Sequence, residues 1–117
     1  MEYRYKKALK FLYSLQKYGI KFGLSKTENL LLKMGKPQKD LKFIHIAGTN
    51  GKGSVATYLN SILTKAGYRV GLYTSPHLVS FTERMRINSQ NIAKEDVVFY
   101  TNIVRKVMDA SEPPTFF

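Results

Sequence analysis

The chain has no cysteine among its 117 residues, so it contains neither a disulfide framework nor a zinc–thiolate site. Its apolar stretches are all shorter than the roughly 20 residues needed to cross a bilayer. Residues 1–19 are interrupted by lysines and lack the apolar segment of a signal peptide. These absences predict a cytoplasmic protein that is not attached to a membrane.

Acidic residues are also scarce, with 8 Asp and Glu against 19 Lys and Arg, which gives a formal net charge of +11. Such a surplus favours anionic partners, namely nucleic acid, phosphates or carboxylate-rich metabolites. Alternatively, the lysines of residues 6–17 only solvate a helix face, or balancing acids lie in a part of the protein outside this chain. The hydrophobic content of 44% indicates a globular domain.

Two helices are expected before residue 40. Residues 3–18 place apolar side chains at helical spacing, and Gly19 would end that helix. Ser25 and Glu28 have the spacing of a capping box, which predicts the start of a second, short helix. The buried side of this second helix is expected at Leu30, Leu31 and Met34. Its end is expected at Gly35 and Pro37.

A strand–loop–helix–strand unit is expected over residues 41–75. LKFIHIA, residues 41–47, predicts a buried strand in which His45 is a core residue with a satisfied hydrogen bond. A helix ended by Gly67 and a second strand over 69–75 follow, and such a unit has parallel strands and a right-handed crossover. The predicted fold class is therefore α/β, the αβα parallel sheet of P-loop NTPases preceded by two helices. The apolar face of the middle helix is expected at Val55, Leu59, Ile62 and Leu63.

Residues 76–92 are mixed in character and predict a loop with a short extended piece around 84–87. A final helix is expected over 94–110, with acidic residues in its first turn. Its apolar face is expected at Val97, Tyr100, Val104 and Val107. Because the sequence stops on two phenylalanines just after Pro-Pro, we expect more chain beyond it.

The segment GTNGKGS, residues 48–54, almost fits the nucleotide loop G-x-x-x-x-G-K-[ST]. Gly53 stands where the pattern requires a hydroxyl, Ser54 follows one place later, and Gly48 precedes Gly51 by three residues. Glycines nevertheless let backbone amides form an anion cradle, a helix N-terminus favours phosphate, and Lys52 adds a positive charge. The segment therefore predicts a phosphate-binding loop, the alternative being an ordinary glycine-rich turn with a surface lysine.

GTNGKGS resembles the nucleotide loop of the folylpolyglutamate synthases, which belong to the Mur ligase superfamily. YTSPHLVSFTERMRIN, residues 73–88, is similar to the T-S-P-H-L and E-R-[IMV]-[RK] segments of these enzymes, and PPTFF resembles the start of their P-[ST]-x-F-E element. GLSKTENLL matches the usual opening of the family. The resemblance implies a helical lead-in over 1–40, a βαβ unit with the phosphate loop over 41–75, and a substrate-side loop, helix and start of the next element over 76–117, without the C-terminal ligase domain.

The resemblance implies a chemistry in which ATP converts the γ-carboxylate of a reduced folate into an acyl phosphate, which the amine of L-glutamate attacks. It places Lys52 in catalysis and Mg²⁺ at Ser54 and Ser75, although a turn residue before Pro76 is an alternative role for Ser75. ATP phosphates would be held by Asn50, Gly51, Lys52, Gly53 and Ser54, and folate would contact Gly23, Leu24, Ser25, Lys26 and Phe117. His77 is interpreted as structural, while Arg84 and Arg86 either bind substrate carboxylates or are surface charges.

Enzymes of this family are several times longer, so this chain is expected to supply the phosphate loop of a monomeric parent enzyme and to be inactive alone. Dihydrofolate synthase, which adds the first glutamate to dihydropteroate, is an alternative activity. GKGS and TSPHL argue against a Mur-type cell-wall ligase, and the displaced hydroxyl argues against a generic P-loop kinase. A nucleic-acid-binding module is disfavoured because the aromatic residues lie mainly on helical faces and no RNA or DNA motif is present.

Overall fold

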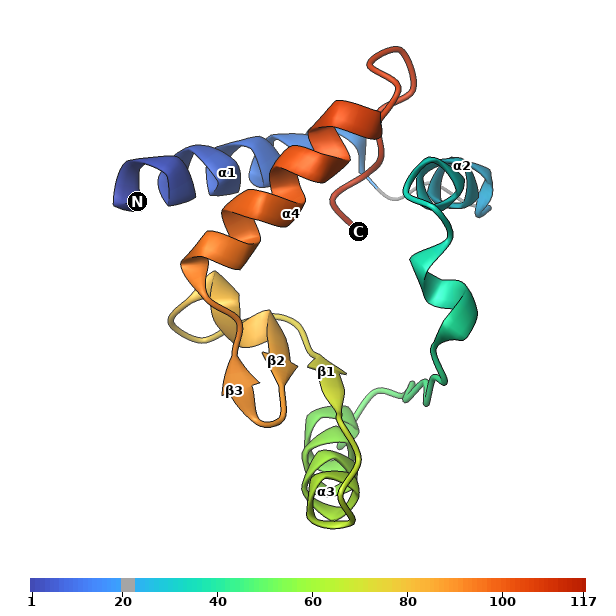
Figure 1. Cartoon of the computed structure of the whole chain (residues 1–117), viewed down its shortest axis with the longest axis vertical. Helices are drawn as coiled ribbons and strands as arrows, with labels where there is room; N and C mark the ends of the chain where they lie inside the picture. The colour runs from blue at the N-terminus through green and yellow to red at the C-terminus, as the bar shows by residue number, and fades with distance from the viewer. Residues whose placement is uncertain (20–22) are drawn as a thin grey trace. The chain divides into compact units, whose positions relative to one another are not determined.

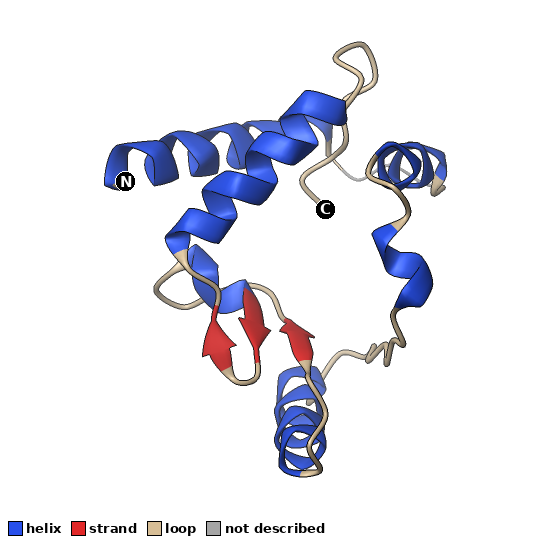
Figure 2. Cartoon of the chain, in the orientation of Figure 1, coloured by secondary structure: helices blue, strands red, loops and turns tan. Residues whose placement is uncertain are grey.

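The computed structural model describes residues 1–19 and 23–117 (Figures 1 and 2). The chain divides into two compact units. Residues 1–42 and 94–117 form the first, here called the helical unit, and residues 43–93 form the second, here called the loop unit. Among the residues that the structure describes, no helix has the length and apolar character required to span a membrane.

The helical unit is built on two helices that lie side by side, α1 (Glu2–Ser14) and α4 (Lys94–Val107) (Figure 1). Its remaining elements are a 3-10 turn (Leu15–Tyr18), α2 (Ser25–Lys33) and a second 3-10 turn (Pro37–Asp40). The helices expected from apolar periodicity are thus confirmed. The lysines of the first helix lie on its exposed side, as the solvation hypothesis expects.

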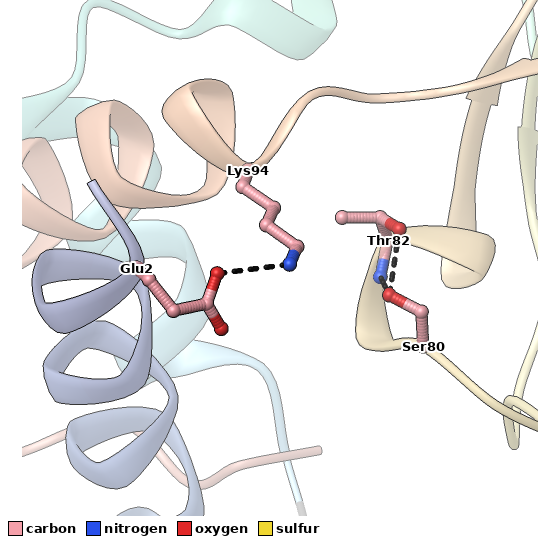
Figure 3. A network of polar contacts seen from close by, with 4 residues as sticks. All are labelled: Glu2, Ser80, Thr82 and Lys94. Atoms are coloured by element: carbon pink, nitrogen blue, oxygen red, sulfur yellow. Dashed lines mark hydrogen bonds and ion pairs between the residues drawn. The ribbon is translucent and has the colours of Figure 1, made fainter.

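The core of the helical unit contains the buried side chains of Tyr5, Ala8, Leu15 and Val97. Lys94 joins the two main helices through an ion pair, in which its Nζ lies 3.0 Å from Oε2 of Glu2 (Figure 3). The same ammonium lies 5.0 Å from the centroid of the Tyr5 ring. The expected face of α4 is correct at Val97 but wrong at Tyr100, which is 56% exposed, and Thr101 is buried instead.

Leu15→Ala should destabilise the helical unit by about 2–4 kcal/mol, because Leu15 is 5% exposed and its truncation leaves a cavity in the core of this unit. Leu32→Ala is the matched control, since Leu32 is 58% exposed and should change stability by less than about 0.5 kcal/mol. Urea unfolding followed by circular dichroism measures both. Equal effects of the two substitutions would contradict the assignment of this core.

The capping box predicted at Ser25 and Glu28 is wrong. Leu24 is the N-cap of α2 and Ser25 is already its first helical residue, so the serine is one place too late to cap. The end of the helix is as expected, because Gly35 follows it with a φ of +84°. Leu30, Leu31 and Met34 form the half-buried side of the helix, although none of them is fully buried.

The loop unit contains α3 (Lys52–Lys65) and a small antiparallel sheet in the order β1 (Gly71–Tyr73), β2 (Met85–Ile87), β3 (Gln90–Asn91). The register pairs Leu72 with Arg86, and Arg86 with Asn91. A 3-10 turn (Phe81–Arg84) precedes β2. The expected strand near 69–75, the extended piece at 84–87 and the helix that ends before Gly67 are therefore confirmed.

The strand predicted over residues 41–47 is wrong, and so is its parallel pairing. This segment forms no strand; Phe43 and Ile44 are 71% and 64% exposed, and His45 is exposed rather than buried. A strand needs a neighbour for its backbone hydrogen bonds, and β1 instead pairs with β2 in antiparallel fashion. The expected apolar face of α3 is wrong at Val55 and Ile62, which are exposed.

Candidate functional site

The glycine-rich loop turns directly into α3. Gly51 is the N-cap of this helix and has a left-handed backbone (φ 78°, ψ 1°), which glycine adopts without steric cost. The amide of Val55 donates to the Gly51 carbonyl at 3.0 Å, so it is the first to make an intrahelical bond. The amides of Lys52, Gly53 and Ser54 consequently lie in the first turn, where a helix supplies no acceptor and attracts anions.

Lys52 lies across this loop, and its ammonium donates to the carbonyl oxygen of Gly48. The lysine is exposed, so binding an anion would exchange its carbonyl acceptor for another acceptor. A shallow hollow beside the loop is lined by Gly53, Ser54, Thr57 and Tyr58. Amides, a cation and a hydroxyl in one place are the groups that bind a phosphate chain.

The turn that carries Ser75 follows β1 in the same unit. Ser75 is exposed two residues beyond the end of β1, as expected for a residue at the carboxyl end of that strand. No hydrogen bond within the described part of the chain joins it to residues 48–54. The backbone of its neighbour Thr74 is fixed, because the Thr74 amide donates to the carbonyl of Arg84 at 2.9 Å.

Glu83 fixes the backbone of the loop that precedes it, residues 78–80. Its carboxylate accepts the amides of Leu78 (3.2 Å), Val79 (3.0 Å) and Ser80. Ser80 in return accepts the amide of Thr82, which completes a capping box at the 3-10 turn (Figure 3). Sequence reasoning missed this role, although Ser80 and Glu83 have the same S-x-x-E spacing as Ser25 and Glu28.

Arg84 and His77 form a second contact in this loop. Nε of Arg84 donates to Nδ1 of His77 at 2.8 Å, and the guanidinium lies 5.4 Å from the centroid of the Phe81 ring. The interpretation of His77 as a structural residue stays a prediction. Arg86 instead donates from Nε to Oδ1 of Asn91 at 2.9 Å, within the β2–β3 hairpin.

Acid should release the Glu83 contacts. The pKa of Glu83 lies below its ordinary 4.5, mainly because its carboxylate accepts the amide of Ser80 and then that of Leu78. The amide of Val79 and the charge of His77 lower this pKa more weakly, and burial opposes them. A pKa lowered by folding means that the stabilisation is present above the ordinary value and is lost as pH falls through the folded pKa. Amide proton shifts of Leu78, Val79 and Ser80 should therefore titrate with a midpoint below 4.5, and Glu83→Gln should abolish that titration. A midpoint at or above the ordinary value would contradict the contact.

The groups available to a cation in the loop unit are hydroxyls rather than carboxylates. Glu83 is the only Asp or Glu in residues 43–93, and it is engaged with three amides. No cluster of three or more His, Cys, Asp or Glu in residues 1–19 and 23–117 could hold a metal ion. Mg²⁺ commonly keeps several waters and binds one or two protein groups plus phosphate oxygens, so a metal that arrives with a nucleotide does not require a carboxylate cluster, and Ser54 and Ser75 stay its predicted ligands.

The predicted folate residues lie in the helical unit and are only partly brought together. Lys26 lines a cavity of about 130 Å³ with residues of α2 and of the chain after α4, among them Met108, Glu112 and Pro114. Gly23, Leu24 and Ser25 are exposed, and none of them lines this cavity. Phe117 is 79% exposed and packs edge-on against Phe116, whose ring lies 5.5 Å from that of Tyr13.

No family profile matches the chain. It is 36% identical over 106 residues to the dihydrofolate synthase/folylpolyglutamate synthase of Bacillus subtilis. The matched residues make up 91% of the chain and 25% of that protein. The crystal structure of folylpolyglutamate synthase from Thermotoga maritima superposes with a TM-score of 0.85 at 42% identity, covering 97% of the chain and 27% of that structure. The structure of the bifunctional Yersinia pestis enzyme complexed with AMPPNP and Mn ion superposes with a TM-score of 0.81 at 32% identity. This match covers 97% of the chain and 27% of that structure.

These similarities confirm the α/β class predicted from the sequence. The chain is homologous to the N-terminal part of the folylpolyglutamate and dihydrofolate synthases, and it spans about a quarter of the length of these relatives.

Proposed function

We propose that this chain forms the ATP-phosphate-binding start of a longer ligase that adds L-glutamate to the γ-carboxylate of a reduced folate. The observation that carries the proposal is the loop before α3. It combines a left-handed Gly51, the ammonium of Lys52 and the first-turn amides, in a chain 36% identical to a dihydrofolate synthase/folylpolyglutamate synthase over 91% of its length.

The chemistry requires activation, because a carboxylate is a poor electrophile. Transfer of the γ-phosphoryl group of ATP to a carboxylate oxygen of folate gives an acyl phosphate and ADP. The amine of glutamate then attacks the acyl carbon, the C–O bond to phosphate breaks, and the amine loses its proton. Lys52 would stabilise charge on the transferring group, while Asn50, Gly51, Gly53 and Ser54 would position the phosphates.

Mg²⁺ would be held by the hydroxyls of Ser54 and Ser75 together with phosphate oxygens. When bound, it would neutralise charge on the phosphates. The folate would contact Gly23, Leu24, Ser25, Lys26 and Phe117, and the cavity beside Lys26 supports this part of the proposal. The full-length enzyme would be a cytoplasmic monomer that acts on small molecules and not on nucleic acid.

Dihydrofolate synthase activity is the second candidate, because the Bacillus subtilis relative carries both activities in its name. The first glutamate would then be added to dihydropteroate by the same two steps. The phosphate loop is common to both reactions, so the choice between them depends on the acid substrate.

The test joins this chain to the remaining three quarters of the Thermotoga maritima relative and supplies Mg·ATP and L-glutamate. One tube contains a reduced folate and a parallel tube contains dihydropteroate, and mass spectrometry detects products lengthened by glutamyl units. We expect lengthened folate, and product in the parallel tube would add the synthase activity. A chimera that binds Mg·ATP but gives no product in either tube would contradict the substrate assignment.

A further inference from the structure

The Glu83–Arg84 pair is a feature that the phosphate loop does not explain. It belongs to the ERMR segment, residues 83–86, which follows the TSPHL turn in the sequence. Both residues contact that turn from its C-terminal side. The amides of Leu78, Val79 and Ser80 donate to the carboxylate of Glu83, so three consecutive residues are fixed by one side chain.

Arg84 contacts the other part of the turn. Its carbonyl accepts the amide of Thr74 at 2.9 Å, and its Nε donates to Nδ1 of His77 at 2.8 Å. Thr74 and His77 are the residues on either side of the Ser75–Pro76 dipeptide. The backbone around Ser75 is therefore bracketed by two contacts that both come from one residue.

Packing among the described residues holds this turn only at His77, whose ring lies edge-on to that of the buried Phe81 at 6.0 Å. Leu78 and Val79 are 93% and 90% exposed, and Ser75 and Pro76 are exposed as well. An exposed loop with little apolar cover is normally mobile, so the polar contacts from Glu83 and Arg84 supply most of the restraint on its remaining residues. Mg²⁺ demands near-octahedral geometry, and a loop residue is a useful ligand only if its position is fixed.

We propose that Glu83 and Arg84 are positioning residues that hold the turn around Ser75 so that its hydroxyl binds the nucleotide-associated cation. This inference rests on the assignment of Ser75 under the proposed function. Neither residue touches the cation or the phosphates in this scheme. Glu83 acts through the backbone amides of residues 78–80, and Arg84 acts through the Thr74 amide and the His77 side chain. The loss of either residue should weaken cation binding more than nucleotide binding.

The test uses the 117-residue chain, ATP, and Mn²⁺ as a spectroscopic substitute for Mg²⁺. Electron paramagnetic resonance gives the affinity of the chain–ATP complex for Mn²⁺, and calorimetry gives the affinity for metal-free ATP. Glu83→Gln keeps the size of the side chain but places an NH₂ group against amide donors. We expect it to weaken Mn²⁺ binding about tenfold, with metal-free ATP binding unchanged within about twofold.

Arg86→Ala is the matched control, because Arg86 lies two residues beyond Arg84 but contacts Asn91 in the hairpin. It should leave both affinities unchanged, whereas Arg84→Lys should resemble Glu83→Gln. Ser75→Ala and the double variant complete a double-mutant cycle with Glu83→Gln. If the positioning acts through Ser75, adding Glu83→Gln to Ser75→Ala causes no further loss of Mn²⁺ affinity.

Two results would overturn the inference. One is a Glu83→Gln chain that binds Mn²⁺ like the unaltered chain although Ser75→Ala binds it weakly. The other is an equal loss of metal-free ATP binding and Mn²⁺ binding, which would show a general structural role. Failure of the ligation assay, by contrast, would refute the proposed function and leave the Mn²⁺ comparison unaffected.

Discussion

Lys52→Ala should weaken binding of Mg·ATP to the chain roughly 10- to 100-fold, as expected for the loss of a hydrogen bond to a charged group. The side chain is exposed and its ammonium contacts the Gly48 carbonyl, so the thermal midpoint should hardly change. In the chimera with the Thermotoga maritima relative, the same substitution should abolish ligation. Calorimetric titration with Mg·ATP and a thermal melt measure the two effects separately.

Lys65→Ala is the matched control, because Lys65 is the last residue of the same helix and is also exposed. It removes the same charge from the opposite end of α3, where a helix attracts cations rather than phosphates. Its affinity for Mg·ATP should stay within about twofold of the unaltered chain, since exposed distant charges are largely screened. Equal losses for both variants would mean that net charge, and not the loop, attracts the nucleotide.

The elements that the sequence predicted correctly are those with local causes. Apolar residues at helical spacing predicted α1, α3 and α4, and Gly67 ends α3 with a φ of +94° as a helix-terminating glycine should. The predicted strand over residues 41–47 failed because strand formation depends on a neighbour elsewhere in the chain. Its composition was that of a strand, yet the described residues provide no partner for it.

The capping boxes show the same limit at a smaller scale. SKTE at residues 25–28 and SFTE at 80–83 fit one pattern equally well, but only the second forms a box. A pattern does not say which residue becomes the N-cap, and at α2 that residue is Leu24. The contacts of Glu83 with Leu78 and Val79 likewise could not be predicted from the sequence, because they depend on how the loop folds back.

The geometry of residues 48–54 was predicted more completely than that of any other part of the candidate site, because its determinants are consecutive, while its phosphate-binding role stays a prediction. Residues 48–54 supply the left-handed glycine, the lysine and the start of the helix within one short segment. Ser75 and the folate residues were placed by resemblance alone. The structure shows Ser75 beyond β1 and Lys26 at a cavity, while their roles stay predictions.

Gly51→Ala should lower stability, whereas Gly53→Ala should not. Gly51 has a φ of +78°, where an added Cβ costs about 1–2 kcal/mol even though nothing lies within 4 Å of it. Gly53 is helical, has no positive φ, and its added Cβ would also meet nothing within 4 Å. Because alanine is the better helix former by up to about 1 kcal/mol, Gly53→Ala should leave stability unchanged or raise it.

Nucleotide binding should nevertheless fall in both variants. Neither backbone strain nor packing in the described chain requires glycine at position 53, so its missing side chain is best explained by the close approach of a ligand. A methyl group there would keep phosphate oxygens from the amides of the first turn, and we expect at least about a tenfold loss of Mg·ATP affinity. Urea unfolding and calorimetric titration of the two variants measure both properties.

The combination expected for Gly53→Ala, full stability with weak binding, is the informative one. A variant that is stable and still binds Mg·ATP normally would show that phosphate does not approach Gly53, and the extra glycine in GKGS would then have no role in the nucleotide site. Weak binding by Gly51→Ala alone would not separate the two explanations, because its strain disturbs the loop itself. Gly53→Ala therefore tests whether the departure of this loop from the common pattern is part of its function.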